Sequence, residues 1–151
     1  MNHRISAGAL IVQDRRILLV RHKKPGEYDF WVAPGGGVIG AETLAEAAQR
    51  EVREETGLEV LLDELVYVEE FHSPETRYCK FWFCASLATG DICTTSPEAT
   101  AEYIVEAAWH ERASLRELQL FPEVLRERFW SDRERGFNGV QHLGLRAMEF
   151  W

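Results

Sequence analysis

The residues from Gly36 to Leu58, GGVIGAETLAEAAQREVREETGL, carry the strongest structural signal in this 151-residue chain. Thr43 is a good N-cap, and Glu46 three residues later completes a capping box, in which side-chain and backbone groups of the first turn bond to each other. Gly57 is suited to end a helix, because glycine adopts the left-handed conformation readily. The segment therefore predicts a helix over about Leu44–Thr56.

One face of this helix changes from apolar to acidic along its length. Its first part should pack on a sheet, since three apolar residues share it at helical spacing: Leu44, Ala47 and Ala48. Three carboxylates continue the same face at i, i+3 and i+4, those of Glu51, Glu54 and Glu55. The alternative is a solvated acidic face, but like charges so close destabilise a helix without compensation. Because hard carboxylate oxygens select Mg²⁺ or Mn²⁺, the pattern favours a site for one of these ions.

The composition limits the class of protein. A length of 151 residues predicts one domain over residues 1–151. No segment approaches the roughly 18–20 apolar residues that span a bilayer, and the N-terminus does not resemble a signal peptide. We therefore expect a cytoplasmic protein with no membrane partner. The three cysteines form no metal-ligand or disulfide pattern, and Cys79 and Cys84 are expected to be buried thiols.

The net charge of −8 bears on the kind of ligand. It disfavours long nucleic acids, which normally bind to a basic face. It does not disfavour a small anionic substrate, since a metal ion can reverse the local field. We expect a small-molecule substrate and no long nucleic acid partner.

The rest of the chain predicts a mixture of strands and helices, and hence an α/β domain with helices packed on a mixed sheet. Two helical segments are expected, near Ser114–Leu118 and Pro122–Trp130. The expected strands include a first hairpin, a short strand that stops at Pro34, a second hairpin with its turn at residues 72–76, and two later strands: Ile5–Val12, Ile17–His22, Trp31–Ala33, Val60–Phe71, Tyr78–Leu87, Ile104–Trp109 and Val140–Leu145.

The segment Gly36–Leu58 also resembles the signature of the Nudix hydrolase family, G-x5-E-x7-R-E-U-x-E-E-x-G-U, where U is a bulky aliphatic residue. All nine positions agree: Gly36, Glu42, Arg50, Glu51, Val52, Glu54, Glu55, Gly57 and Leu58. Seven fixed identities would match by chance about once in 10⁸ windows at ordinary residue frequencies. The resemblance implies an α/β/α sandwich with a mixed β-sheet, and hydrolysis of a nucleoside diphosphate linked to another group.

The resemblance also implies roles for particular residues. The expected ligands of Mg²⁺ or Mn²⁺ are Glu51, Glu54 and Glu55 with the backbone carbonyl of Gly36. Arg50 and Glu42 would orient these ligands, and Arg50 should also form an ordinary helix pair with Glu46. The base that takes a proton from water lies either on the helix, at Glu54 or Glu55, or in a later loop, here Thr94–Glu106. In that loop Glu102 is the first candidate and Glu98 the second, and the alternative is that both are solvated.

The residues that would bind the substrate are less specific. Cationic candidates for the phosphates are Arg21, Lys23, Lys24, Arg77 and Lys80, with Arg21 preferred because it ends a strand beside the signature loop. Tyr28 and Phe71 are candidates for stacking on a base, although core packing is the expected role of Phe71.

Three readings of the function stay open. Pro74, 16 residues after Leu58, resembles the pattern of ADP-ribose pyrophosphatases and favours ADP-ribose or an ADP-sugar. The alternative is that Pro74 only shapes the hairpin turn, where proline is common. A nucleoside triphosphate pyrophosphohydrolase that cleanses the nucleotide pool would use the same helix. A catalytically inactive ligand sensor is disfavoured, because the signature glutamates are all present. A homodimer is an open expectation, for which Phe150 and Trp151 would suit an interface.

Overall fold

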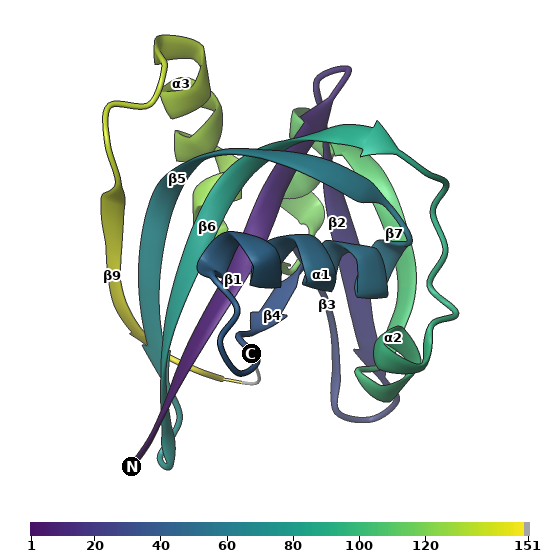
Figure 1. Ribbon diagram of the computed structural model, residues 1–151, viewed down its shortest axis with the longest axis vertical. Helices are drawn as coiled ribbons and strands as arrows, with labels where there is room; N and C mark the ends of the chain where they lie inside the picture. The colour runs from purple at the N-terminus through teal and green to yellow at the C-terminus, as the bar shows by residue number, and fades with distance from the viewer. Residues whose placement is uncertain (150–151) are drawn as a thin grey trace.

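The computed structural model describes residues 1–149 as a mixed sheet with helices packed against it (Figure 1). The sheet order is β8-β3-β2-β1-β6-β5-β9, with β4 paired to β1 and β7 paired to β2. The strands are β1 (Asn2–Gln13), β2 (Arg16–Lys24), β3 (Tyr28–Val32), β4 (Gly35–Gly37), β5 (Glu59–His72), β6 (Thr76–Thr89), β7 (Ile104–Glu111), β8 (Leu120–Phe121) and β9 (Gln141–Ala147). The helices are α1 (Leu44–Thr56), α2 (Pro97–Ala101) and α3 (Arg128–Arg135), with two short 3₁₀ helices, η1 (Arg112–Glu117) and η2 (Glu123–Arg126).

Strand β1 organises the sheet. It runs parallel to β6 from Asn2 to Ile11, and it pairs with β4 on its other side through Ser6–Gly8. Only its end, Val12 and Gln13, pairs with β2. The β1–β6–β5 part and the β2–β3–β7 part therefore diverge from the tip of the β1–β2 hairpin (Figure 1). A cavity lined by residues of both parts lies between them.

Apolar side chains pack on both faces of β6, since neighbouring residues of a strand point to opposite sides. Phe83 packs with Ala47 and Ala48 of α1, whereas Trp82 belongs to the main core with Phe129 of α3. Helix α1 crosses the sheet in front of β1 (Figure 1). This arrangement confirms the α/β/α sandwich that the sequence predicts.

Most element predictions are confirmed. Helix α1 has the predicted bounds, the capping box of Thr43 and Glu46 forms, and Gly57 has a φ of 76°. The two hairpins and the late strand β9 are also present. Two predictions were wrong in detail. The expected helix over Pro122–Trp130 is interrupted at Glu127 (φ −143°, ψ −58°), and the expected loop Thr94–Glu106 contains the helix α2. The start of β7 at Ile104 agrees with the expected strand Ile104–Trp109.

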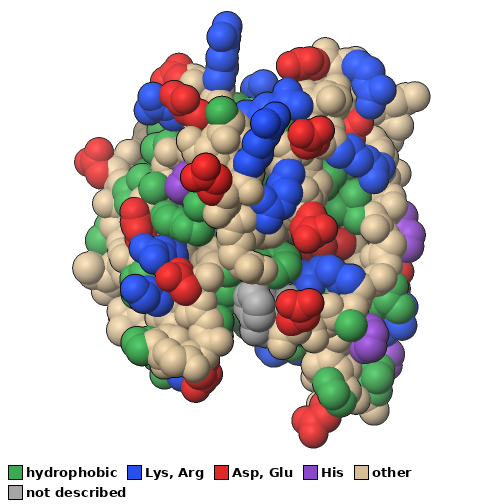
Figure 2. Space-filling model, turned by 180° about the vertical axis from the view of Figure 1, so that it is seen from behind, with side chains coloured by type: hydrophobic (Ala, Val, Ile, Leu, Met, Phe, Trp, Pro, Cys, Tyr) green, Lys and Arg blue, Asp and Glu red, His purple; other side chains and the backbone are tan. Residues whose placement is uncertain are grey.

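The face opposite that of Figure 1 carries many Lys and Arg side chains in its upper half, among Asp and Glu (Figure 2). Arg126 stabilises the chain itself by donating hydrogen bonds to the carbonyl oxygens of Leu115 and Leu118. No helix within residues 1–149 is long and apolar enough to cross a membrane. The dimer contact suggested for Phe150 and Trp151 lies outside the described residues.

Candidate active site

The acidic end of α1 faces the glycine strand β4. The Gly35 N–H donates to the Glu55 carboxylate at 3.3 Å. At Gly36, a Cβ atom would lie 2.6 Å from the Glu51 carboxyl group, closer than real contacts allow. A glycine is therefore required at position 36, because any side chain would displace the Glu51 carboxylate.

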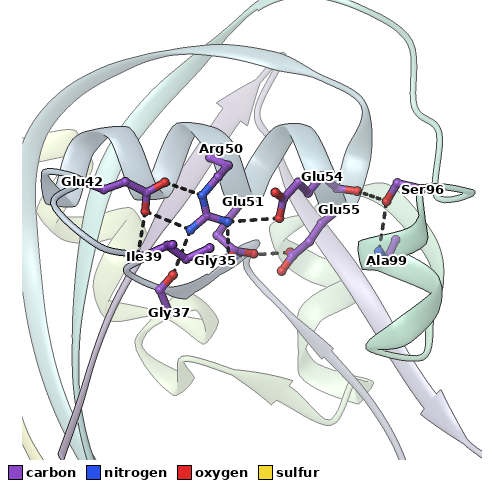
Figure 3. A network of polar contacts seen from close by, with 10 residues as sticks. All are labelled: Gly35, Gly37, Ile39, Glu42, Arg50, Glu51, Glu54, Glu55, Ser96 and Ala99. Carbon is purple, nitrogen blue, oxygen red and sulfur yellow. Dashed lines mark hydrogen bonds and ion pairs between the residues drawn. The ribbon is translucent and has the colours of Figure 1, made fainter.

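Arg50 holds the acidic side chains in place (Figure 3). Its guanidinium donates to both carboxylate oxygens of Glu42, to Glu51 at 3.0 Å and to Glu54 at 3.1 Å. A further hydrogen bond of 2.9 Å reaches the Gly37 carbonyl oxygen and joins α1 to β4. The expected pair with Glu46 does not form, because the Glu46 carboxylate instead accepts from the Thr43 N–H in the capping box. Arg50 therefore contacts Glu51, Glu54 and the Gly37 carbonyl together, which its expected orienting role requires.

Helix α2 brings Glu102 to the same place. The Ser96 side chain caps α2 by accepting from the Ala99 N–H and donates to the Glu54 carbonyl oxygen, so α2 is attached to α1 (Figure 3). Glu102 follows the last turn of α2, and its carbonyl oxygen lies 3.1 Å from Nδ1 of His22. Since a carbonyl can only accept, Nδ1 carries the proton.

Carboxylate oxygens of Glu51, Glu55 and Glu102 lie within 4.8 Å of one another. The structure therefore joins Glu102 to two of the three predicted helix glutamates. Glu54 is directed toward Arg50 and keeps 25 % of its side chain exposed. Glu98 does not belong to this group.

Burial and mutual repulsion raise the pKa of all three carboxyl groups. The pKa of Glu55 is raised furthest, first by complete burial and then by the charges of Glu51 and Glu102. Desolvation likewise raises the pKa of Glu51, against the opposing effect of Arg50, and that of Glu102. Glu55 is 2 % exposed, and its Oε1 has no hydrogen-bond partner among the described residues.

These features fit a bound Mg²⁺ or Mn²⁺. A divalent cation would neutralise the cluster and provide the missing partner of Glu55 Oε1. The donor set consists of hard oxygens with no cysteine or histidine in the group, which suits these two ions better than zinc.

A cavity of about 370 Å³ opens beside the cluster, between the two parts of the sheet. It is lined by Gly35, Gly36 and Gly37, by Glu102, and by aromatic and polar side chains that include His22, Tyr28, Phe30, Phe71, Tyr78, Lys80 and Tyr103. The rings of Phe71 and Tyr78 are stacked at 4.8 Å, and those of His22 and Phe30 at 5.1 Å. Burial lowers the pKa of His22 to about 4, so its ring is neutral at physiological pH.

The predicted substrate-binding residues separate into two groups. Tyr28 lines the cavity, and so does Phe71, which the sequence assigned to the core. Arg21 and Arg77 do not line the cavity: Arg21 pairs with Asp29 and Glu106, and Arg77 pairs with Glu70. The preference for Arg21 over Lys80 is thus not supported, because Arg21 is held outside the cavity.

Among the cavity residues, His22 and Tyr103 were not named from the sequence, and Lys80 was only one of five cationic candidates. Lys80 is 2 % exposed and lies two residues before Trp82 on β6. The alternation of Tyr78, Lys80 and Trp82 would have placed all three on one face of the strand. Tyr103 has a φ of 60°, a conformation that is uncommon for residues other than glycine, next to Glu102. Such positions cluster at functional sites.

Comparisons with known proteins agree with this site. Residues 2–129 match the family model described as the NUDIX domain. The chain is 41% identical over 99 residues to the 8-oxo-dGDP phosphatase NUDT18 of Homo sapiens, which covers 66% of this chain and 29% of that protein. It is 29% identical over 101 residues to the ADP-ribose pyrophosphatase of Methanocaldococcus jannaschii, covering 66% and 60% of the two chains.

Among solved structures, a NUDIX hydrolase from Nitrosomonas europaea superposes with a TM-score of 0.78 at 20% identity, over 98% of this chain and 81% of that one. At this identity the likeness concerns the fold. The chain spans about three tenths of the length of the human relative.

Proposed function

The chain belongs to the Nudix family, and from this premise we propose that it is a metal-dependent hydrolase that cleaves the diphosphate linkage of a nucleoside diphosphate or of a nucleoside diphosphate linked to another group. The observation that carries the proposal is the cluster of Glu51, Glu55 and Glu102 at the edge of an aromatic-lined cavity. A base and a diphosphate would fit side by side in this arrangement, with the diphosphate next to the carboxylates.

The residues of the cluster have different roles in this proposal. Glu51 and Glu55, with Glu54 and the Gly36 carbonyl, would hold Mg²⁺ or Mn²⁺. When bound, this ion supplies positive charge that neutralises the phosphate oxygens and the leaving group. Arg50 keeps the carboxylates oriented through its hydrogen bonds to Glu51 and Glu54.

Glu102 is our candidate for the general base. It lies at the side of the cluster that lines the cavity, so its carboxylate can reach a water molecule beside the diphosphate. The raised pKa of Glu102 brings it closer to the neutral range in which a base works best. Its backbone is fixed by His22, which limits the positions of the carboxylate.

For the substrate, the first candidate is a purine nucleoside diphosphate carrying an oxidised base. Support comes from the relative named 8-oxo-dGDP phosphatase and from the aromatic lining of the cavity, on which a planar base can stack. The cavity volume of about 370 Å³ suits one base with its sugar.

ADP-ribose is the second candidate, favoured by the archaeal relative of that activity. Pro74 adds little to this candidate, because it lies in the turn between β5 and β6 and does not line the cavity.

The test is a panel of 8-oxo-dGDP, dGDP, ADP-ribose, ADP-sugars and nucleoside triphosphates, incubated with Mg²⁺, Mn²⁺ or EDTA and separated by ion-exchange chromatography. We expect metal-dependent release of a nucleoside monophosphate, with 8-oxo-dGDP cleaved fastest. Fastest release of AMP from ADP-ribose would replace the first candidate by the second. Cleavage of triphosphates to pyrophosphate would favour the pool-cleansing alternative. A folded protein that binds these nucleotides without cleaving any of them would refute the hydrolase and favour a sensor.

A further inference from the structure

Lys80 is a buried cation to which the roles above assign no task. It lies on β6 between Ser6 of β1 and Glu69 of β5, which are its partners in the sheet register. Its side chain is 2 % exposed and lines the cavity. Burying an ammonium group is costly unless ionic partners compensate for the lost water. Its burial therefore depends on the charged groups around it.

The ammonium group of Lys80 is surrounded by an aromatic ring and acidic side chains. Nζ lies 4.4 Å from the centre of the Trp82 ring, an attractive cation–π distance. The Trp82 indole N–H donates to Glu69 Oε1 at 3.1 Å, so Trp82 and Glu69 form one fixed support. The charges that act on Lys80 are those of Glu69, Glu55, Glu51 and Glu102, which together oppose the effect of burial on its pKa.

Neutralising Glu69 does not by itself explain Lys80. Glu69 already accepts the Trp82 hydrogen bond, and its other carboxylate oxygen lies 3.9 Å from Nε of Arg146. Glu69 thus has two partners without Lys80.

The other cations near the cluster are placed differently. Arg50 is committed to Glu42, Glu51, Glu54 and the Gly37 carbonyl, on the α1 side of the carboxylates. Arg4 is exposed and pairs in register with Tyr78, two positions nearer the start of β1 than the pair of Ser6 and Lys80. Among the described residues that line the cavity, Lys80 is the buried cation.

We propose that Lys80 is a substrate-binding residue whose ammonium group, buried in the cavity lining, donates to a non-bridging oxygen of the diphosphate. An ammonium has three donors, so it can stay attracted to the nearby Glu69 charge while it donates to a phosphate oxygen. The diphosphate would then lie between a fixed cation of the protein and the metal ion. This inference rests on the proposed function, because it assumes a phosphate chain in the cavity.

The test compares Lys80→Met, which keeps the length of the side chain and removes the charge, with Lys80→Arg and with the control Lys23→Met. The sequence named Lys23 as a candidate for the phosphates as well, but Lys23 is exposed and does not line the cavity, so it is not part of the proposed site. Two affinities are measured by calorimetry: that of α,β-methylene-GDP, which is not hydrolysed, in the presence of Mg²⁺, and that of Mn²⁺ without nucleotide. Circular dichroism shows whether each variant is folded.

We expect Lys80→Met to bind the analogue about 10- to 100-fold more weakly, the range for a lost charge-assisted hydrogen bond. Its affinity for Mn²⁺ should be unchanged or higher. The positive charge of Lys80 repels a metal cation, and the variant lacks this charge. Lys80→Arg should recover part of the analogue affinity, and Lys23→Met should match the wild type.

Two results would overturn the assignment of Lys80 alone: unchanged analogue affinity in Lys80→Met, or a loss of Mn²⁺ affinity in parallel, which would mean that Lys80 only supports the carboxylate cluster. A wild-type protein that binds Mn²⁺ but not the analogue would instead overturn the proposed function, and the role of Lys80 with it.

Discussion

Replacing Glu55 by Gln should move stability and activity in opposite directions. Glu55 is 2 % exposed, its Oε1 has no hydrogen-bond partner among the described residues, and Glu51 and Glu102 repel its charge. Glutamine has the same shape without the charge. Removing the charge of a buried carboxylate that has one unpartnered oxygen should therefore stabilise the metal-free protein by about 1–3 kcal/mol.

The pH dependence of this difference follows from the raised pKa of Glu55. The folded protein holds the Glu55 proton more tightly than the unfolded chain does. Wild-type stability therefore falls as the pH rises from the ordinary carboxyl value of about 4.3 toward the raised value. Below this window both proteins carry a neutral group at position 55, and the difference in stability should disappear.

Metal should reverse the order of stability. At 100 times the dissociation constant, Mg²⁺ would stabilise the wild type by about 2.7 kcal/mol, and a variant that has lost a ligand should gain much less. Turnover of the preferred nucleotide should fall by about 10²- to 10⁴-fold if Glu55 binds the metal or acts on water.

The assays are urea unfolding at pH 4 and pH 8 with EDTA or Mg²⁺, and turnover followed by ion-exchange chromatography. Glu64→Gln is the matched control, because Glu64 is exposed on β5. A Glu55→Gln protein that is less stable than the wild type without metal, or that retains wild-type turnover, would refute this account of Glu55.

Three further predictions concern the surroundings of the cluster. Arg50→Gln should weaken Mg²⁺ binding in calorimetry by about 10- to 100-fold, and no change in Mg²⁺ affinity would contradict the orienting role. Arg50→Gln should also lower the stability of the fold, because Glu42 loses its cationic partner, and adding Glu42→Gln should restore part of that stability. Glu102→Gln should lower kcat by about 10²- to 10⁴-fold while Glu98→Gln leaves it unchanged, and equal effects would exclude Glu102 as the base. His22 has a pKa of about 4 instead of 6.5, so the unfolded chain binds more protons between these pH values. The free energy of unfolding should therefore rise with pH across this range by up to ~3 kcal/mol. Urea unfolding of His22→Asn should show a smaller change of this free energy with pH, and an equal change would contradict the prediction.

The sequence was sufficient for features that depend on neighbours along the chain. The bounds of α1 follow from Thr43, Glu46 and Gly57, whose effects act within one turn. The convergence of Glu51 and Glu55 follows from helical spacing in the same way. Such local rules are largely independent of how the rest of the chain folds.

Features that depend on distant segments were predicted less well. Glu102 joins the cluster because Ser96 attaches α2 to α1, a contact between residues 42 positions apart. Sequence analysis expected a loop there and could name Glu102 only as one of two candidates. Glu54 is turned toward Arg50, which also engages Glu42 and Gly37, and the i,i+3 spacing contains no information about these competing partners.

The choice of cation shows the same limit. Arg21 ends up beside Asp29 because β2 and β3 pair, and this ion pair removes it from the cavity. Lys80 enters the cavity because β1 and β5 pair on either side of β6 and leave its face toward Trp82 and Glu69. Both outcomes depend on strand pairing, whereas the sequence shows only that both residues are cationic.

One helix serves both folding and chemistry, and this explains how the chain tolerates its buried charges. The Ala47 and Ala48 end of α1 packs on the sheet, and the capping box and Gly57 secure both termini. Arg50 compensates part of the negative charge, while Glu55 is left with an unpartnered oxygen. The fold thus bears a local electrostatic cost at the position where a divalent cation and a phosphate chain would remove it, so binding of metal and substrate should stabilise α1 and α2 together.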